Sequence, residues 1–209
     1  MDIKNKKINF MGDSITAGVG TSCKEAMFVN LIGADGAVVR NYGISGTRLA
    51  KQQDKNDCYD KSFCERFDSM DKDADIVIVF GGTNDYGHGD APFGDENDTE
   101  YTTFCGACNW FMNEFKNTYK NAKLLFLTPI HRENEDAPSP ANSLPLSAYV
   151  NAIKSIAKKH DVSVLDLYDK CEIFPDDPKS KEKYCPDGLH PNDAGNALIK
   201  NLIVDYIKN

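Results

Sequence analysis

"DIVIVFGG", at residues 75–82, is a continuous apolar run that ends in two glycines. A strand buried on both faces has this pattern, whereas a strand with one wet face alternates apolar and polar residues. Strands buried on both faces are typical of parallel sheets that carry helices on each side. The stretch therefore predicts a strand of a parallel α/β sheet.

The segments on either side of this strand alternate between strand and helix patterns. Further apolar runs predict strands at residues 7–11, 37–43, 123–129 and 162–167. Amphipathic segments predict helices at residues 24–33, 58–70, 103–119, 146–160 and 193–208. This alternation predicts a single α/β domain over residues 1–209, in which helices cover both faces of a five-stranded parallel sheet.

The composition narrows the range of partners. The 209 residues include 24 Lys and Arg against 32 Asp and Glu, a net charge of -8, which disfavours a nucleic-acid backbone as partner. No apolar run reaches the roughly 20 residues that span a bilayer, and the N-terminal lysines are not followed by a signal-peptide core. A cytoplasmic protein is favoured, and a secreted protein whose signal has been removed stays open.

The cysteines do not predict a metal centre. Seven cysteines scattered over the chain favour reduced thiols, although up to three disulfides stay open. Only Cys105 and Cys108 have the CxxC spacing of a redox or zinc motif, and a zinc site needs a second such pair. We therefore expect structural thiols and no metal.

The residues that follow the predicted strands are polar and rich in glycine. In parallel α/β folds the functional site lies outside the carboxyl ends of the strands, which meet at one edge of the sheet. The segments expected at that edge are "GDSIT" from residue 12, "NYGISGTRL" from 41, "GGTND" from 81, "TPIHR" from 128 and "DGLHP" from 187.

These segments contain the parts that acyl transfer requires. Ser14 can be a nucleophile, and Asp187 lies three residues before His190, so its carboxylate can orient the imidazole toward the serine. The backbone N–H of Gly46 and the side-chain amide of Asn84 can stabilise an oxyanion. Each residue alone also suits an ordinary turn or helix cap. Their occurrence in order, after separate strands, favours a site.

Four sequence blocks together resemble the SGNH hydrolases, the superfamily that includes the GDSL-type esterases and lipases. This resemblance covers nearly the whole chain and implies a flavodoxin-like three-layer α/β/α sandwich that hydrolyses esters without a metal or cofactor. Ile15 replaces the leucine of the GDSL motif, a tolerable change at a position expected to be buried. The matching blocks are "FMGDSITAG" (10–18), "NYGISG" (41–46), "GGTND" (81–85) and "DGLHPN" (187–192).

The resemblance also implies a role for each residue. Ser14 would attack the acyl carbon and form an acyl-enzyme, His190 would be the general base, and Asp187 would orient His190. The oxyanion would be held by the backbone N–H groups of Ser14 and Gly46 and by the side chain of Asn84.

The substrate is predicted less sharply. Two polar, acidic stretches at 85–101 and 131–143 are expected to rim the site, and neither resembles a basic amphipathic lid for lipid. We therefore expect a small acyl group such as acetyl on a carbohydrate or other polar acceptor, in part because members of the family act on sugars. A lysophospholipase-type or thioesterase-type acylhydrolase is the alternative. The candidate substrate contacts are Asp13, Tyr86, His88 and His131.

Other functions stay open. "GDSITAG" can cradle a flavin or nucleotide phosphate at a helix N-terminus, although that reading leaves Asn84 and the Asp187–His190 pair unexplained. A catalytically inactive sugar-binding relative is a further alternative. Among the remaining segments, Arg132 is expected to form a surface ion pair, and residues 172–184 are expected to form a surface loop.

Overall fold

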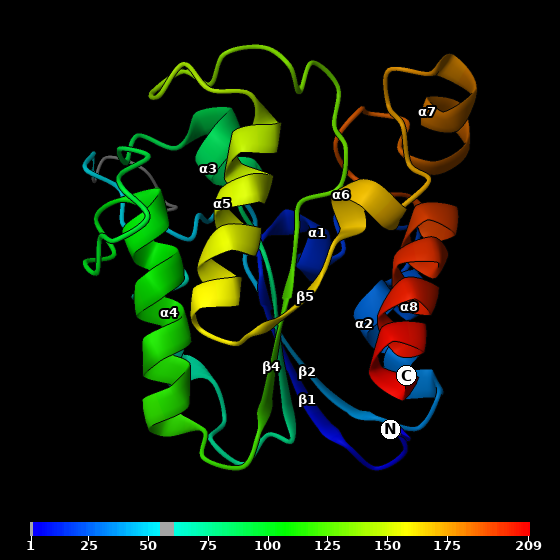
Figure 1. Ribbon diagram of the computed structural model, residues 1–209. Helices are drawn as coiled ribbons and strands as arrows, with labels where there is room; N and C mark the ends of the chain where they lie inside the picture. The colour runs from blue at the N-terminus through cyan, green and yellow to red at the C-terminus, as the bar shows by residue number, and fades with distance from the viewer. Residues whose placement is uncertain (1, 55–60) are drawn as a thin grey trace.

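Five parallel strands form one sheet at the centre of the computed structural model, which describes residues 2–54 and 61–209 (Figure 1). The spatial order β2-β1-β3-β4-β5 is that of flavodoxin-like folds and confirms the expected α/β sandwich. The strands are β1 (Lys7–Gly12), β2 (Val38–Gly43), β3 (Ile76–Phe80), β4 (Lys123–Leu127) and β5 (Ser163–Leu165).

Helices cover both faces of this sheet (Figure 1). One face packs against α4 and α5, and the other against α2 and α8. The α-helices are α1 (Ser14–Ala17), α2 (Phe28–Ala34), α3 (Thr83–His88), α4 (Phe104–Thr118), α5 (Leu146–Lys159), α6 (Leu167–Lys170), α7 (Pro178–Tyr184) and α8 (Asp193–Lys208). Two 3₁₀ turns are η1 (Lys24–Ala26) and η2 (Phe67–Ser69).

Strand β3 divides the hydrophobic core into two layers. Val77 and Val79 point into the layer under α4 and α5, whereas Ile76 and Ile78 point into the layer under α2 and α8. Successive side chains of a strand point to opposite faces, so a strand covered on both sides must be apolar throughout. Every residue of β3 is buried, as "DIVIVFGG" predicts.

The helix predicted at 24–33 is broken at Met27. This residue has extended backbone angles, φ -63° and ψ 135°, and separates η1 from α2. The first N–H of α2, from Phe28, is donated to the side-chain oxygen of Asn196 in α8 at 3.0 Å. The start of α2 is therefore fixed by a contact with a distant helix, which the local pattern does not contain.

The helix predicted at 58–70 is replaced by turns. Residues 58–60 lie outside the described part of the chain, and of the rest, residues 63–66 form a turn and residues 67–69 form η2. The backbone N–H and hydroxyl of Ser62 both bond to the carboxylate of Glu65 at 3.0 Å, a side-chain arrangement that competes with helical backbone bonds. Two expected loops, conversely, contain short helices, because α3 begins within "GGTND" and α7 occupies much of 172–184.

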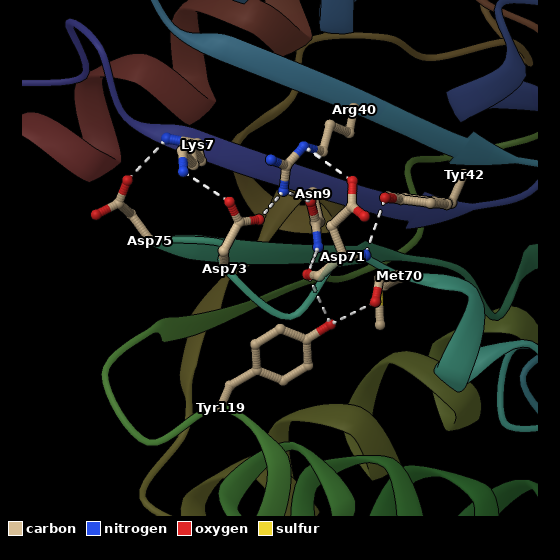
Figure 2. A network of polar contacts seen from close by, with 9 residues as sticks. All are labelled: Lys7, Asn9, Arg40, Tyr42, Met70, Asp71, Asp73, Asp75 and Tyr119. Carbon is tan, nitrogen blue, oxygen red and sulfur yellow. Dashed lines mark hydrogen bonds and ion pairs between the residues drawn. The ribbon is translucent and has the colours of Figure 1, made fainter.

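A network of polar contacts lies beside the amino ends of β1 and β3 (Figure 2). Arg40 pairs with Asp71 at 3.1 Å and with Asp73 at 2.6 Å, and Lys7 pairs with Asp73 at 2.6 Å. The hydroxyl of Tyr119 donates to the backbone carbonyl oxygens of Met70 and Asp71. We call the set the amino-edge network; it comprises Lys7, Asn9, Arg40, Tyr42, Met70, Asp71, Asp73, Asp75 and Tyr119.

The carboxyl ends of the strands meet at the opposite edge, where α1, α3 and α6 lie in Figure 1. Because all strand pairs are parallel, the segments after β1, β2, β3 and β4 gather there. Among the helices formed by the described residues, none is long and apolar enough to cross a membrane.

Candidate active site

Ser14 is the first residue of α1, directly after β1. Its side chain is held on a single helical turn that Asp13 caps, accepting the N–H of Ile15 at 3.0 Å. Burial raises the pKa of the Asp13 carboxyl to about 7; the nearby Asp85 adds to the rise, and the N–H of Ile15 opposes it. The expected substrate contact at Asp13 is thus a buried helix cap beside the serine.

Ser14, His190 and Asp187 form a continuous hydrogen-bonded chain. The Nε2 atom of His190 lies 2.9 Å from Oγ of Ser14, and its Nδ1 atom lies 2.7 Å from Oδ2 of Asp187. The other oxygen of Asp187 accepts the backbone N–H groups of Leu189 at 2.9 Å and His190 at 2.7 Å. A hydroxyl, an imidazole and a carboxylate therefore stand in the order that serine activation requires.

The environment of Asp187 keeps this carboxylate charged. Partial burial acts to raise its pKa, but the N–H groups of His190 and Leu189 and the imidazole outweigh burial, so the pKa lies below the ordinary value. An ionised Asp187 accepts the Nδ1–H of His190. That tautomer leaves Nε2 as the acceptor for the Ser14 hydroxyl.

The loop after α1 holds the His190 segment in place. Gly20 lies against it so closely that a Cβ there would be 2.7 Å from the carbonyl oxygen of Pro191. Ser22 donates its N–H to Asp193 at 2.8 Å and its hydroxyl to the same carboxylate at 2.5 Å. The loops of the nucleophile and the imidazole are thereby joined by direct contacts.

Gly46 and Asn84 belong to two segments that contact each other through Thr47. Gly46 has φ +76°, a conformation that favours glycine, within a turn closed by hydrogen bonds from Thr47 to the carbonyl oxygen of Ile44. The Nδ2 of Asn84 donates to the carbonyl oxygen of Thr47 at 3.0 Å. The Oδ1 of Asn84 is 3.1 Å from Nε2 of His88. His88, an expected substrate contact, thus orients the Asn84 amide.

Tyr86, an expected substrate contact, points into the core. Its side chain is buried, and its hydroxyl bonds to the carbonyl oxygens of Asn134 at 2.8 Å and Ala137 at 2.9 Å. The ring also packs edge-on against Tyr149. Tyr86 therefore anchors the 131–143 stretch, because its position on α3 turns it into the core.

His131 lies in a small group of aromatic side chains. Its Nδ1 atom is 2.7 Å from Oε1 of Glu135, and its ring is 4.1 Å from that of Tyr168 and 5.0 Å from that of Phe174, between centroids. Phe174 is one of the large apolar residues with an exposed side chain. The group adjoins the Asp187 turn, since the N–H of Glu133 donates to the carbonyl oxygen of Gly188 at 2.8 Å.

Among residues 2–54 and 61–209, Arg132 has no ion-pair partner, which corrects the expectation of a surface ion pair. Its guanidinium donates to the carbonyl oxygen of Thr83 at 3.0 Å and lies 5.3 Å from the centre of the Tyr86 ring. A planar guanidinium can stack on an aromatic face while it hydrogen-bonds in its plane. Arg132 thereby holds the first residue of α3, next to Asn84.

Four buried charged residues lie beneath the site, and the sequence did not single out their burial. Asp85 accepts the N–H groups of Leu49 at 2.9 Å and Ala50 at 3.0 Å, and burial raises its pKa to about 6. Burial lowers the pKa of the Arg66 guanidinium to about 10, and Asp13 opposes this. We call the set the carboxyl-edge cluster; it comprises Asp13, Arg48, Arg66 and Asp85.

Neither a metal centre nor a reactive thiol pair emerges from the residues that the structure describes. Within residues 2–54 and 61–209, no group of three or more His, Cys, Asp or Glu could hold a metal ion. Cys105 and Cys108 are buried in α4, and burial raises the pKa of Cys105 to about 12. Cys58 lies outside the described residues.

Comparisons with known proteins identify a family and several similar folds. The model of the GDSL-like lipase/acylhydrolase family matches residues 10–198. A protein from Lactobacillus plantarum is 29% identical and superposes with a TM-score of 0.84 over 99% of this chain and 98% of that one. A lipase/acylhydrolase from Enterococcus faecalis is 22% identical, with a TM-score of 0.68 over 97% and 95% of the two chains.

A third similar structure is an acetylxylan esterase from Geobacillus stearothermophilus, 19% identical. It superposes with a TM-score of 0.66, covering 100% of this chain and 97% of that one. At this identity the likeness concerns the fold. The comparison with curated protein sequences gave no match.

Proposed function

This chain belongs to the GDSL-like lipase/acylhydrolase family and is an ester-bond hydrolase, and we propose that Ser14 is its nucleophile, His190 its base and Asp187 the residue that orients His190. The observation that carries the proposal is the hydrogen-bonded chain, 2.9 Å from Ser14 to His190 and 2.7 Å from His190 to Asp187. A nucleophile within hydrogen-bond reach of an oriented base is the arrangement that activates a serine hydroxyl.

The reaction follows from these positions. As Oγ of Ser14 attacks the ester carbon, His190 Nε2 takes the hydroxyl proton and the carbonyl electrons move to oxygen. Collapse of the tetrahedral adduct breaks the bond to the alcohol, which leaves with the proton from His190. Water then attacks the acyl carbon while His190 takes a proton from it. The second tetrahedral adduct collapses, the bond from the acyl carbon to Oγ breaks, and Oγ recovers the proton from His190 as the acid departs.

The oxyanion is held, in this proposal, by the backbone N–H groups of Ser14 and Gly46 and by the amide of Asn84. One Nδ2–H of Asn84 bonds to Thr47, which leaves the second for the substrate oxygen. The contact between Oδ1 and His88 fixes the plane of the amide. Donors held in advance need no reorganisation as charge develops, which is the main source of their catalytic effect.

The substrate that we propose is a small acyl ester, such as an acetyl ester, on a carbohydrate. The acidic, polar character of residues 85–101 and 131–143 supports a polar acceptor. The exposed ring of Phe174, beside His131, offers an apolar face to a sugar ring near the Asp187 turn.

A longer acyl chain is the competing substrate, and one observation favours it. Val19 and Ile44 are exposed apolar residues close to the nucleophile in the chain. The N–H of Val19 donates to the carbonyl oxygen of Ser14 at 2.9 Å, and that of Ile44 to the carbonyl oxygen of Gly12 at 3.1 Å. These side chains would suit the acyl group of a lysophospholipid or thioester.

Hydrolysis of p-nitrophenyl acetate, butyrate and octanoate tests the proposal, with Ser14→Ala alongside wild type. We expect acetate to give the highest kcat/KM and Ser14→Ala to lose at least about 10³-fold. Ser163→Ala, an exposed serine on β5, is the matched control and should retain wild-type rates. A Ser14→Ala protein with the wild-type rate would overturn the mechanism, and a preference for octanoate would replace the proposed acyl group.

Release of acetate from acetylated xylose and from acetylated xylo-oligosaccharides tests the acceptor. The proposal predicts turnover of both that disappears in Ser14→Ala. Rapid hydrolysis of p-nitrophenyl acetate without release from either sugar would contradict the carbohydrate acceptor and leave the serine mechanism standing.

A further inference from the structure

One buried guanidinium touches three separate segments at the carboxyl edge of the sheet. Nη1 of Arg66 donates to the carbonyl oxygen of Tyr42 at 2.8 Å. Nη2 donates to the carbonyl oxygen of Gly12 at 3.1 Å and to the hydroxyl oxygen of Thr47 at 3.0 Å. The residue is only 7% exposed, so these contacts are shielded from water.

Each of these acceptors lies within four residues of a proposed oxyanion donor. Gly12 is two residues before Ser14, and Thr47 directly follows Gly46. Tyr42 lies near the end of β2, from which the chain continues into the Gly46 turn. Arg66 therefore connects the segment that supplies the Ser14 N–H with the segment that supplies the Gly46 N–H.

Thr47 links Arg66 to Asn84, the third proposed donor. Its hydroxyl accepts from Arg66 and donates to the carbonyl oxygen of Ile44 at 2.7 Å, which closes the turn around Gly46. The carbonyl oxygen of Thr47 accepts from Asn84 at 3.0 Å. All three proposed donors thus share one set of hydrogen bonds that begins at Arg66.

We infer that Arg66 is a positioning residue of the oxyanion hole, which sets the separation of the Ser14 and Gly46 N–H groups through Gly12 and Thr47. The inference rests on the proposed function, because that proposal assigns these N–H groups to the oxyanion. Arg66 touches neither the substrate nor the reacting atoms in this scheme. It acts by holding the loops that do.

The chemistry of the side chain fits this role. A guanidinium presents donors in a rigid plane and can bond several fixed acceptors at once, whereas an ammonium is a compact point charge on a flexible stem. Among the described residues, Nε of Arg66 has no hydrogen-bond partner. A buried donor without a partner costs stability. The fold therefore tolerates an unpaired Nε, while Nη1 and Nη2 of Arg66 donate hydrogen bonds to the loops.

Two substitutions at Thr47 test the inference with little change in shape. Thr47→Val removes the hydroxyl that links Arg66 to the Gly46 turn, and Thr47→Ser keeps it. On p-nitrophenyl acetate we expect Thr47→Val to lower kcat about tenfold and to change KM by no more than about twofold. The reason is that the oxyanion donors, which this contact positions, bind the transition state more strongly than the ester. Thr47→Ser should stay within about twofold of wild type.

Arg66→Lys tests the guanidinium itself, with Arg40→Lys in the amino-edge network as the matched control. We expect Arg66→Lys to lower kcat about tenfold to a hundredfold and to weaken binding of phenylboronic acid, which forms a tetrahedral adduct with a reactive serine, by a similar factor. Arg40→Lys should change neither. In the double variant Arg66→Lys/Thr47→Val the losses should be less than multiplicative, since both act through one contact.

The outcomes separate this inference from the proposed function. If Thr47→Val and Arg66→Lys lower the melting temperature but keep kcat and the boronic acid affinity within about twofold, Arg66 is merely structural and the inference is wrong. If Arg66→Lys does not fold, the Thr47 pair alone decides. If Ser14→Ala is fully active, the proposed function itself fails, whatever the Arg66 variants do.

Discussion

The two edges of the sheet both carry arginines and aspartates, but in opposite surroundings. Figure 2 shows the amino-edge network. In it the side chains of Arg40, Asp71 and Asp73 are 22%, 61% and 55% exposed. In the carboxyl-edge cluster Arg66 and Asp13 are 7% and 2% exposed. The same kinds of residue are thus exposed to solvent at one edge and buried at the other.

This difference separates two uses of charge. Exposed ion pairs contribute little to stability, because water and salt screen them. Buried charges cost free energy unless they are paired and hydrogen-bonded, so a fold that keeps them keeps their geometry as well. Only the carboxyl edge carries the proposed catalytic residues. The comparison predicts that substitutions there change catalysis, while those at the amino edge leave catalysis unchanged and lower stability only slightly.

The largest effect is expected from the triad. His190→Ala removes the proposed base and should lower kcat by about 10⁵-fold or more, and Asp187→Ala should cost less, about 10⁴-fold. Single-turnover hydrolysis of p-nitrophenyl acetate measures both. Equal rates for wild type and His190→Ala would contradict the proposal that the carboxyl edge holds the catalytic residues. His160→Ala is the control, because His160 lies at the end of α5 and contacts Asn109 of α4.

Asn84 should show the next largest effect. Asn84→Ala removes one proposed oxyanion donor and should lower kcat about 10²- to 10³-fold with little change in KM. Steady-state kinetics on p-nitrophenyl acetate measures kcat and KM separately. His88→Ala, which frees the Asn84 amide to rotate, should cost less than Asn84→Ala. A loss expressed wholly in KM would assign Asn84 to ground-state binding instead.

The buried carboxyl of Asp13 should make the stability of the protein depend on pH. Burial raises its pKa from 3.8 to about 7, so the folded protein holds a proton that the unfolded chain releases above about pH 4. The resulting stability is full below about pH 4 and is lost as pH rises through about 7. Asp13→Asn lacks this loss, so its free energy of unfolding should rise relative to wild type by about 2 kcal/mol between about pH 5 and pH 8.

Urea denaturation of both proteins across that pH range measures the difference. Asp13→Asn keeps an oxygen for the N–H of Ile15, so the helix cap is preserved. A constant difference between the two proteins at every pH would mean that Asp13 ionises as an exposed carboxyl does.

The smallest effect is expected at the amino edge. Arg40→Met removes the pairs with Asp71 and Asp73 and should lower the melting temperature by about 3 °C or less at low salt. The difference should shrink further in about 0.5 M sodium chloride, because exposed pairs are screened. A large, salt-independent loss would show that the amino-edge network is as important to the fold as the carboxyl-edge cluster.

The elements that the sequence predicted well are those whose cause is local. Strand β3 is apolar along its whole length, and α8 begins at Asp193 because Asn192 caps it, accepting the N–H of Gly195 at 3.1 Å. Apolar period and capping residues are both visible in a single segment. The order of the strand-end motifs likewise predicted which residues would meet at the carboxyl edge.

What the sequence did not predict depends on contacts between distant segments. Whether Tyr86 turns inward depends on the carbonyl oxygens of residues about 50 positions later, and the burial of Arg66 depends on Gly12, 54 positions earlier. The break at Met27 depends on Asn196 in α8. Composition gives such residues the same appearance whether they face water or the core.

The distance along the chain between Ser14 and His190 has a consequence for biosynthesis. The two residues are 176 positions apart, and the last strand, β5, ends at Leu165, well before the imidazole is made. The chain is synthesised from its N-terminus at about 5–20 residues per second, and every strand of the sheet precedes His190, the proposed base. If the proposed mechanism holds, the growing chain carries Ser14 without the means to activate it, and we expect hydrolysis to begin only when the segment leading into α8 has docked.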